Sequence, residues 1–503
     1  MKTPSSRWWA LAALALAMLT IGLDTTVLTV AMPTLATDLG ATTAQLQWFS
    51  SAYTLVLAAT LLPAGALGDR YGRRRLLLGA LLLFGAASVI CAYAGSANGL
   101  IAARAVLGLG AAIMMPLSMA VLPVIFTDAA ERARALTVWV TATAIGLPLG
   151  PILGGWLLTH FWWGSIFLIN VPLVVLGVIA VALFVPESRS DRPTPLDLVG
   201  VLLSSLGLLG LTYGFIRAGQ DGWSDPGTPL TIAAGLLLLV GFVAWQRRTA
   251  HPLIDLALFR SRGFTWGSIL ATGVNFALFG LLFAVPQFLQ SVTGATALGT
   301  GVRLLPLIAG LLVGTRLADR LVRTFAPGPV LAVGFVLLTI GLALGANTAT
   351  DTAYWYTGTW IALVGAGMGV ALPTAMNAAL GALSTERSGS GSALIQALRQ
   401  AGGTIGVAIL GTILSSGYRS GLGDEVRLPV SDSVTAGVAV ARQLGRPDLL
   451  DTVRSAYVHG MDLMLWACAG ICVVAAITAV IVLPRRRPAA QPVPDAPESV
   501  HVG

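Results

Sequence analysis

Lysine is nearly missing from this 503-residue chain. Lys2 is the only lysine, and apart from histidine all other basic residues are arginines. A nucleotide-binding P-loop needs a lysine that reaches the phosphates, and pyridoxal chemistry needs an internal lysine. Lys2 stands in the N-terminal tail, so the chain has neither. Any uphill work would draw its energy from a gradient or a partner, and we expect no cofactor and no ATPase subunit.

Histidine and cysteine are also scarce. The four histidines are far apart in sequence, and no HExxH motif is present. The three cysteines (Cys91, Cys468 and Cys472) lie inside apolar runs, where the thiol is most simply a small apolar filler. We therefore expect no metal site, and since no catalytic constellation is visible, we expect no enzyme.

Charge is the third shortage. Only 10% of the residues are charged, whereas 56% are hydrophobic and the mean hydropathy is +0.82. A soluble globular chain has about 25% charged residues, so this chain needs the lipid bilayer. The net charge of +8 does not indicate nucleic acid, because the arginines form short clusters between apolar runs.

The apolar runs predict an all-α membrane protein with 14 transmembrane helices. Runs of about 20 apolar residues are long enough to cross a bilayer. They are centred near residues 20, 57, 84, 112, 147, 175, 207, 237, 278, 309, 338, 367, 403 and 471. Between the last two runs we expect a long outer loop at about 417–457. Arginine is concentrated in alternate connections, which predicts a multi-pass protein of the cell membrane with both termini in the cytoplasm. The preference for Arg, Ala and Gly is typical of a GC-rich bacterium.

Four landmarks recur 250–257 residues apart, which predicts two parallel repeats. Asp69-Arg70 is echoed by Asp319-Arg320, and Glu131-Arg132 by Glu386-Arg387. The string 108–116 is echoed by 365–373, and Gly146 with Gly150 by Gly402 with Gly406. We expect a six-helix bundle at 1–190, a two-helix linker at 191–262, a second six-helix bundle at 263–484 related by a pseudo-twofold axis, and a disordered cytoplasmic tail at 485–503.

Asp24 lies inside the first apolar run, about nine residues from its predicted outer end. Hydrocarbon disfavours the ionised carboxyl, so this group is able to take up and release a proton. Arg104 in the fourth run is predicted at a similar depth, and its approach or departure would change the proton affinity of Asp24. The alternative is that both side chains only hold helices together.

The connection at 65–75 reads GALGDRYGRRR and is predicted to be a gating loop. Gly65 and Gly72 would permit a tight turn, and Asp69, Arg70 and Arg73 would make contacts that break when one face opens. Its copy holds Asp319 and Arg320 but has Val322 in place of the second glycine. The alternative is a plain topogenic loop.

The run at 146–155 reads GLPLGPILGG. Gly146, Gly150 and Gly154 recur every four residues and form a bare helix face for close packing, while Gly155 follows directly. Pro148 and Pro151 are expected to bend the helix. We expect this packing to keep the two halves sealed during transport.

Arg399 is predicted to lie near the middle of its span, where an arginine indicates function. It would either hydrogen-bond carbonyl groups or contact the cargo. Further polar residues inside apolar runs are candidates for a substrate cavity, although each is as readily explained as a hydrogen bond between helices. They are Asn275, Gln287, Gln290, Asn377 and Gln396.

These strings resemble the major facilitator superfamily, and specifically its 14-span drug:proton antiporters of the EmrB/QacA type. Residues 65–75, 104–112, 146–155 and 23–33 match four of that family's motifs, and the likeness covers about 8–483. The resemblance implies proton coupling through Asp24 and Arg104 and efflux of a lipophilic drug or antibiotic, with resistance as the outcome. Members that handle divalent cations tend to carry an acid in span 10, where this chain has none before Asp319. The alternative is a transporter of an ordinary metabolite on the same fold.

Overall fold

The computed structural model describes residues 4–189, 195–381, 383, 388–423 and 430–483, and every regular element in this part of the chain is helical. The first half holds α1 (Pro4–Asp38), α2 (Thr43–Tyr71), α3 (Arg73–Ala92), α4 (Ala97–Ile125), α5 (Ala129–His160), α6 (Ser165–Leu168) and α7 (Asn170–Phe184). Two helices follow, α8 (Leu198–Asp221) and α9 (Gly227–Gln246), and then the short 3₁₀ turn η1 (Leu256–Arg260).

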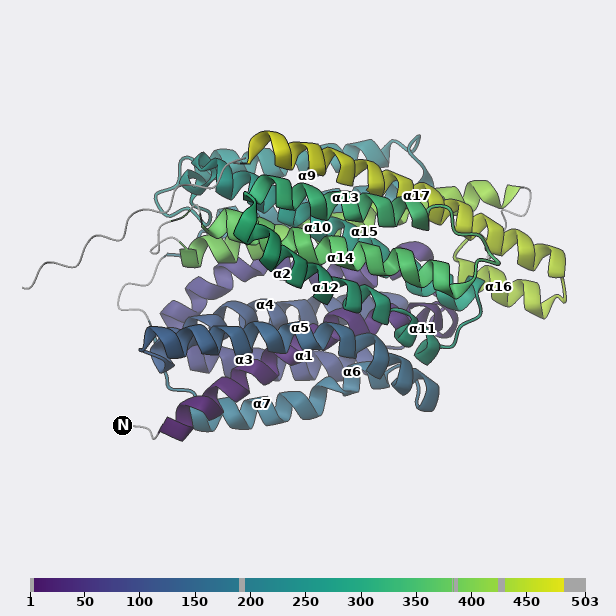
Figure 1. The fold of residues 1–503 in the computed structure, drawn as a ribbon. Helices are drawn as coiled ribbons and strands as arrows, with labels where there is room; N and C mark the ends of the chain where they lie inside the picture. Colours follow the sequence, from purple (N-terminus) through teal and green to yellow (C-terminus); the bar gives the residue numbers. More distant parts are fainter. Residues whose placement is uncertain (1–3, 190–194, 382, 384–387, 424–429, 484–503) are drawn as a thin grey trace, which may run out of the picture.

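The second half begins with α10 (Arg262–Gln287), which continues into the π-helical turn η2 (Phe288–Val292). It goes on through α11 (Ala297–Arg303), α12 (Leu305–Thr324), α13 (Pro327–Gly345), α14 (Tyr354–Leu380), α15 (Ser388–Gly421), α16 (Val434–Gln443) and α17 (Pro447–Val482). Figure 1 shows the helices lying side by side along one direction, with α1, α3, α5 and α7 on one side and α10, α13, α14 and α17 on the other.

Thirteen segments within the described residues are helical, long and apolar enough to cross a membrane. They coincide with thirteen of the fourteen predicted runs. The remaining prediction, near residue 147, falls on α5, a helix of 32 residues that is not among the thirteen. The all-helical membrane architecture is therefore confirmed.

The two halves repeat the same close helix contacts. A Cβ atom added to Gly108 would meet the carbonyl oxygen of Tyr53 on α2, and one added to Gly110 would meet Phe84 on α3. In the second half, Gly365 and Gly367 of α14 approach α12 and α13 in the same way. The repeated glycines therefore mark positions where a helix backbone is pressed against its neighbours.

Two main contacts join the halves. The helix α5 packs against α11, and α2 packs against α15, so each half contributes one partner to each contact. The helix α8 lies against α2 and α15, and α9 packs mainly on α8. The pair α8 and α9 therefore covers the contact between α2 and α15.

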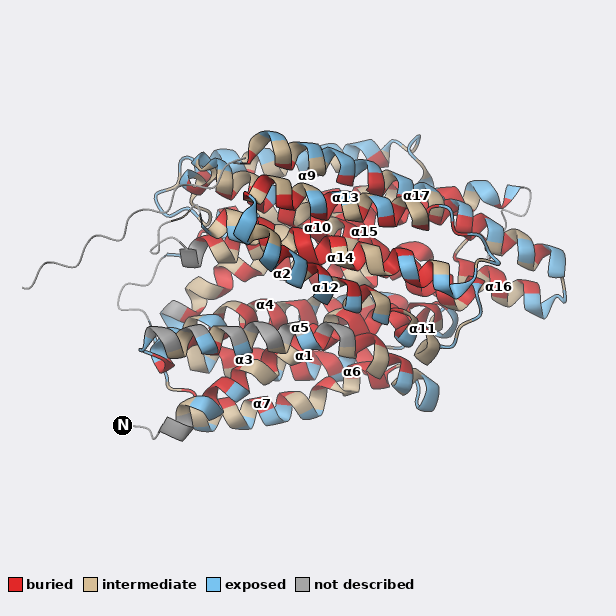
Figure 2. Ribbon diagram, viewed as in Figure 1, coloured by how far each residue is buried: buried red, intermediate tan, exposed pale blue. Residues whose placement is uncertain are grey.

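Figure 2 shows buried residues through the middle of the bundle and exposed ones along its outer faces. Those outer faces are apolar: on α9, for example, Leu237 is 71% exposed and Val240 is 65% exposed. Apolar surface on this scale is not left to water, and in a helical bundle of this length it indicates lipid.

One expectation about the connections was wrong. The segment 417–457 was expected to be a long loop, but α15 continues to Gly421, α16 occupies Val434–Gln443, and α17 begins at Pro447. The opposite end of the bundle from the N-terminus therefore carries helical structure (Figure 1). The echoed pair Glu386-Arg387 and the tail after residue 483 lie outside the described residues.

Candidate functional site

Asp24 and Arg104 form a buried ion pair. The Nη1 atom of Arg104 donates to Oδ2 of Asp24 at 2.7 Å, and the two side chains are 2% and 0% exposed. The guanidinium also donates through Nε to the carbonyl oxygen of Phe49 at 3.0 Å, and its carbon lies 4.5 Å from the ring centroid of Tyr53. The sequence-predicted partners are therefore brought into direct contact by α1, α4 and α2.

Asn170 completes the site and was not predicted from the sequence. Its Nδ2 atom donates to Oδ1 of Asp24 at 3.0 Å and lies 3.3 Å from the hydroxyl oxygen of Ser88. Each carboxylate oxygen of Asp24 thus accepts a hydrogen bond. In the sequence, Asn170 is visible only as an amide at the start of an apolar run, LINVPL, and nothing there pairs it with α1. The structure shows that this amide is fully buried.

The position of Asp24 along α1 differs from the expectation. The helix runs on through Pro33 to Asp38, so Asp24 lies fourteen residues before its end and not nine. Removing one partner of a buried pair leaves the other charge unpaired and costs about 3–5 kcal/mol. The site therefore depends on Asp24 and Arg104 together.

The glycine face of α5 is pressed against the turn of α1 that carries Asp24. A Cβ atom on Gly146 would come within 2.7 Å of the carbonyl oxygen of Leu19, and one on Gly150 within 2.9 Å of that of Leu23. Gly154 meets Val27 in the same way. This face packs inside the first half, so the expectation that it seals the two halves was wrong for these three glycines.

The contact with the second half is made one residue further on. A Cβ atom on Gly155 would lie 2.6 Å from the Ala297 carbonyl oxygen of α11, and Gly301 of α11 packs on the Pro151 carbonyl oxygen. The motif at 146–155 therefore has two faces, one toward Asp24 and one toward the other half. The side chain of Pro148 lies outside the described part of the chain.

The gating-loop residues lie where α2 meets α3. The connection is the single residue Gly72, whose φ of 104° favours glycine, and a Cβ atom there would meet the carboxylate of Glu187. Gly65, by contrast, lies inside α2 and takes no part in the turn, which corrects that expectation. The side chain of Asp69 is outside the described residues.

Glu187, which follows α7, was missed by sequence reasoning although it contacts this connection. Its Oε1 accepts from the backbone N–H of Arg74 at 3.1 Å, and Oε2 lies 3.7 Å from Nε of Arg75. The guanidinium of Arg73 donates to the Ala120 carbonyl oxygen of α4 at 3.1 Å. Arg70 is exposed, as are Asp319 and Arg320 near the end of α12.

A cavity of about 600 Å³ lies between the halves at the end of the bundle that carries the α2–α3 connection. We call this end the basic end. The lining is contributed by α2, α4, α5 and α15, and it includes Gly65, Arg73 and Gln396. Residues 195–197 and 251–255, which flank the linker helices, also line it.

Arg399 is held by uncharged groups. Its Nη2 atom donates to Oδ1 of Asn275 at 3.1 Å, and Nη1 donates to Oε1 of Gln396 and lies 3.7 Å from the Met376 sulfur. It lies eleven residues from the start of α15 and twenty-two from its end, closer to the basic end than the predicted mid-span position.

The other cavity candidates lie elsewhere. Gln287 bonds within its own helix to the Phe283 carbonyl oxygen, and Gln290 donates across the halves to the Val30 carbonyl oxygen at 2.8 Å. Asn377 is exposed on α14. Of the five predicted polar residues, Gln396 is in the cavity lining, while Asn275 is buried beside Arg399.

Comparisons with known proteins match the whole arrangement. Residues 14–407 match the family described as the Major Facilitator Superfamily. The chain is 36% identical to the multidrug efflux pump LfrA of Mycolicibacterium smegmatis, over 92% of this chain and 93% of that protein. It is 30% identical to the tetracenomycin C resistance and export protein of Streptomyces glaucescens, over 94% and 91%.

Among solved structures, a bacterial homologue of the human lysosomal transporter Spinster, in an inward-facing and unoccupied conformation, has a similar fold. The TM-score is 0.69 with 16% identity, over 96% of this chain and 98% of that one.

Proposed function

Because the chain belongs to the Major Facilitator Superfamily, we propose that it exports a lipophilic small molecule in exchange for protons. Drug and antibiotic efflux proteins are its relatives over more than nine-tenths of their length. The observation that carries the coupling is the buried Asp24–Arg104 pair, since a carboxyl group removed from water and facing one cation is suited to exchange a proton.

The same proposal includes the topology. Counting α5 with the thirteen candidate spans gives fourteen, divided as six in 1–190, two in 191–262 and six in 263–484. The arginines at the basic end then make that end cytoplasmic by the positive-inside rule, with both termini on the same side. The large cavity consequently faces the cytoplasm, and the opposite end is closed by α5 against α11 and by α2 against α15.

The coupling step follows from the contacts of Asp24. With the carboxylate ionised, Arg104 and Asn170 both donate to it and tie α4 and α7 to α1. Protonation removes the negative charge and weakens both bonds, so Arg104 keeps only its bond to the Phe49 carbonyl oxygen and its contact with Tyr53. The glycine face of α5 presses on the same turn of α1, and this contact transmits the change to the contact with α11.

The cavity fits a mainly apolar cargo. Its walls carry Leu61, Leu62, Met115 and Met119 among a few polar groups, of which Gln396 and Arg73 are examples. Apolar pockets with a few placed polar groups are typical of sites for small organic ligands. One proton moving down about 150 mV releases roughly 3.5 kcal/mol, which supports a cargo gradient of a few hundred-fold.

The test is retention of a panel of antibiotics in a drug-sensitive bacterial host that expresses the chain, with and without an uncoupler. We expect lower retention only while the proton gradient is present. The variant Asp24→Asn combined with Arg104→Gln removes both charges, which avoids an unpaired buried cation. It should reach the membrane at normal abundance and fail to lower retention; efflux equal to that of the unaltered chain would refute the proposal.

A further inference from the structure

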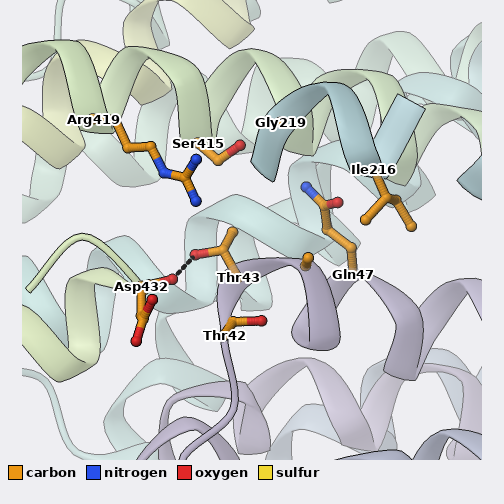
Figure 3. Close-up of a pocket in the computed structure, with 9 residues that line it drawn as sticks. Thr42, Thr43, Gln47, Ile216, Gly219, Ser415, Arg419 and Asp432 are labelled. Atoms are coloured by element: carbon orange, nitrogen blue, oxygen red, sulfur yellow. Dashed lines mark hydrogen bonds between the residues drawn. The ribbon is translucent and has the colours of Figure 1, made fainter. Parts of the chain in front are cut away.

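A second, smaller pocket lies at the end of the bundle opposite the basic end. It has a volume of about 30 Å³ and is built by the start of α2, the ends of α8 and α15, and Asp432 before α16 (Figure 3). The backbone N–H and the hydroxyl of Thr43 donate to the Asp432 carbonyl oxygen at 2.9 and 2.6 Å. The pocket therefore lies where the first half, the linker and the second half meet.

Gln47 points into this pocket from α2 (Figure 3). The side chain is 1% exposed, yet its Oε1 atom has no hydrogen-bond partner. A buried amide oxygen without a donor costs about 1–3 kcal/mol, so the site favours a ligand that donates hydrogen bonds. The space beside it is large enough for water and too small for a larger ligand, so the ligand that fits is water.

The polar character continues along one face of α2 toward the ion pair. Ser51 follows Gln47 by four residues, is 0% exposed and has a hydroxyl group without a partner. Thr54 follows by three more and accepts a bond at 2.7 Å from Thr404 of α15. Residues three and four apart lie on the same helix face, so Gln47, Ser51 and Thr54 form a polar row beside the second half.

The row ends at the site already described. Thr54 lines another, still smaller cavity of about 10 Å³, together with Thr25, Tyr53 and Arg104. Arg104 in turn holds Asp24. The hydroxyl of Tyr53 is buried at this cavity, so both ends of the row meet polar groups.

We propose that the polar row of Gln47, Ser51 and Thr54 carries the water through which a proton from the opposite face reaches Asp24 when the two halves part at that end. This inference rests on the proposed function. In the present arrangement the pocket of Figure 3 and the cavity at Arg104 are separate, and Asp24 is 0% exposed, so this face has no open path to Asp24. Parting of α2 from α15 joins them.

Cysteine accessibility tests the water path directly. Gln47→Cys and Ser51→Cys are treated in cells with a thiol reagent that does not cross the membrane, while the chain either exports an antibiotic or is held without cargo and gradient. The native cysteines are all buried, and Leu57→Cys, on a buried part of α2 in the first-half core, is the control. We expect modification at 47 and 51 to speed up about tenfold during export and position 57 to stay unreactive. Export without faster modification at either position would overturn the path.

Replacing the polar groups tests the function of the row. Gln47→Leu and Ser51→Ala should each slow cargo-linked proton uptake about tenfold in sealed vesicles, while antibiotic binding stays unchanged. Gln47→Asn and Ser51→Thr should restore much of the rate. Thr60→Val is the control, because its hydroxyl bonds to its own helix at Val56. If the apolar variants match this control while Asp24→Asn stops exchange, the route is wrong and the proposed function stands; if Asp24→Asn exchanges normally, the proposed function itself fails.

Discussion

The carboxyl group of Asp24 is held by side chains from two other helices, and each contact has a distinct consequence. Arg104 supplies the counter-charge, Asn170 occupies the second oxygen, and the backbone of α5 fixes the turn of α1 through its glycines. A small displacement of α1 therefore changes all three contacts. Protonation of this single residue would therefore change how α1 packs against α4, α5 and α7.

The glycine contact gives a prediction at this scale. Gly150→Ala places a Cβ atom against the Leu23 carbonyl oxygen and the Val27 nitrogen, both at 2.9 Å, and backbone atoms yield little. We expect a loss of about 1–3 kcal/mol in the free energy of unfolding and a clear drop in efflux. Gly79→Ala on α3 is the matched control, because nothing lies within 4 Å of its added Cβ atom. Thermal unfolding in detergent measures the stability of both variants. Equal melting temperatures for Gly150→Ala and Gly79→Ala would contradict the account.

The sequence allowed Asp24, Arg104 and the glycine face to be predicted because charged or bare residues are conspicuous in an apolar run. Asp24 and Arg104 could be proposed as partners because both were predicted in the outer part of their helices. Asn170 and Glu187 could not be found in this way, since the sequence carries no information on which helices become neighbours. The direction of the glycine face was mistaken for the same reason.

The linker pair shows how one polar residue organises an element. Asp197 caps α8 by accepting from the Gly200 backbone N–H at 2.8 Å, and it also accepts from Trp245 and Gln246 at the end of α9. Burial alone would raise the pKa of Asp197, but these hydrogen bonds outweigh it and lower the pKa below its ordinary value. The two helices are thus tied together at the edge of the large cavity.

Asp197→Asn should therefore destabilise the chain at pH 7. The NH₂ group of the new asparagine would face a hydrogen-bond donor where a carboxylate oxygen now accepts. A hydrogen bond to a charged group contributes about 1.5–3 kcal/mol, and this contribution would be lost. Because the folded pKa is depressed, the contribution is complete above the unfolded pKa of about 3.9 and fades as pH falls through the lower folded value. Melting temperatures of the variant and the unaltered chain should differ at pH 7 and converge below about pH 4. The control Asp351→Asn, at an exposed turn, should have the same melting temperature as the unaltered chain at pH 7. A melting-temperature difference for Asp197→Asn that does not narrow on acidification would contradict the stabilising role of the Asp197 carboxylate.

Elements were predictable to the extent that length and hydropathy define them. Thirteen apolar runs became thirteen candidate spans. The helix α16 escaped prediction because it is only 10 residues long, and the first turns of α17 did so because they mix charged with apolar residues. Both owe their helical state to packing against the second half, with Val434, Val438 and Val453 in its core.

At the scale of the whole molecule, one end of the bundle is hollow between the halves and the other is closed. The cavity at the basic end is lined by both halves and by the segments that flank α8 and α9. The closed end is held by glycine contacts between α5 and α11 and by the Thr43–Asp432 bonds. Alternating access requires that these two ends exchange roles.

Filling the cavity should stop transport without unfolding the chain. Ala66→Trp adds an indole to the lining contributed by α2, so cargo should be excluded while the open cavity absorbs the added volume. Efflux is expected to fall about tenfold or more at normal membrane abundance. Ala86→Trp adds the same group to an exposed position of α3 and is the control. Normal efflux in Ala66→Trp would mean that cargo takes another path.

The most direct measurement is exchange in sealed vesicles that contain the purified chain. An imposed pH difference should drive antibiotic movement, and an antibiotic gradient should in turn move protons, both only when Asp24 and Arg104 are intact. Antibiotic movement at the same rate with no pH or voltage difference, or proton exchange that survives Asp24→Asn, would contradict the account.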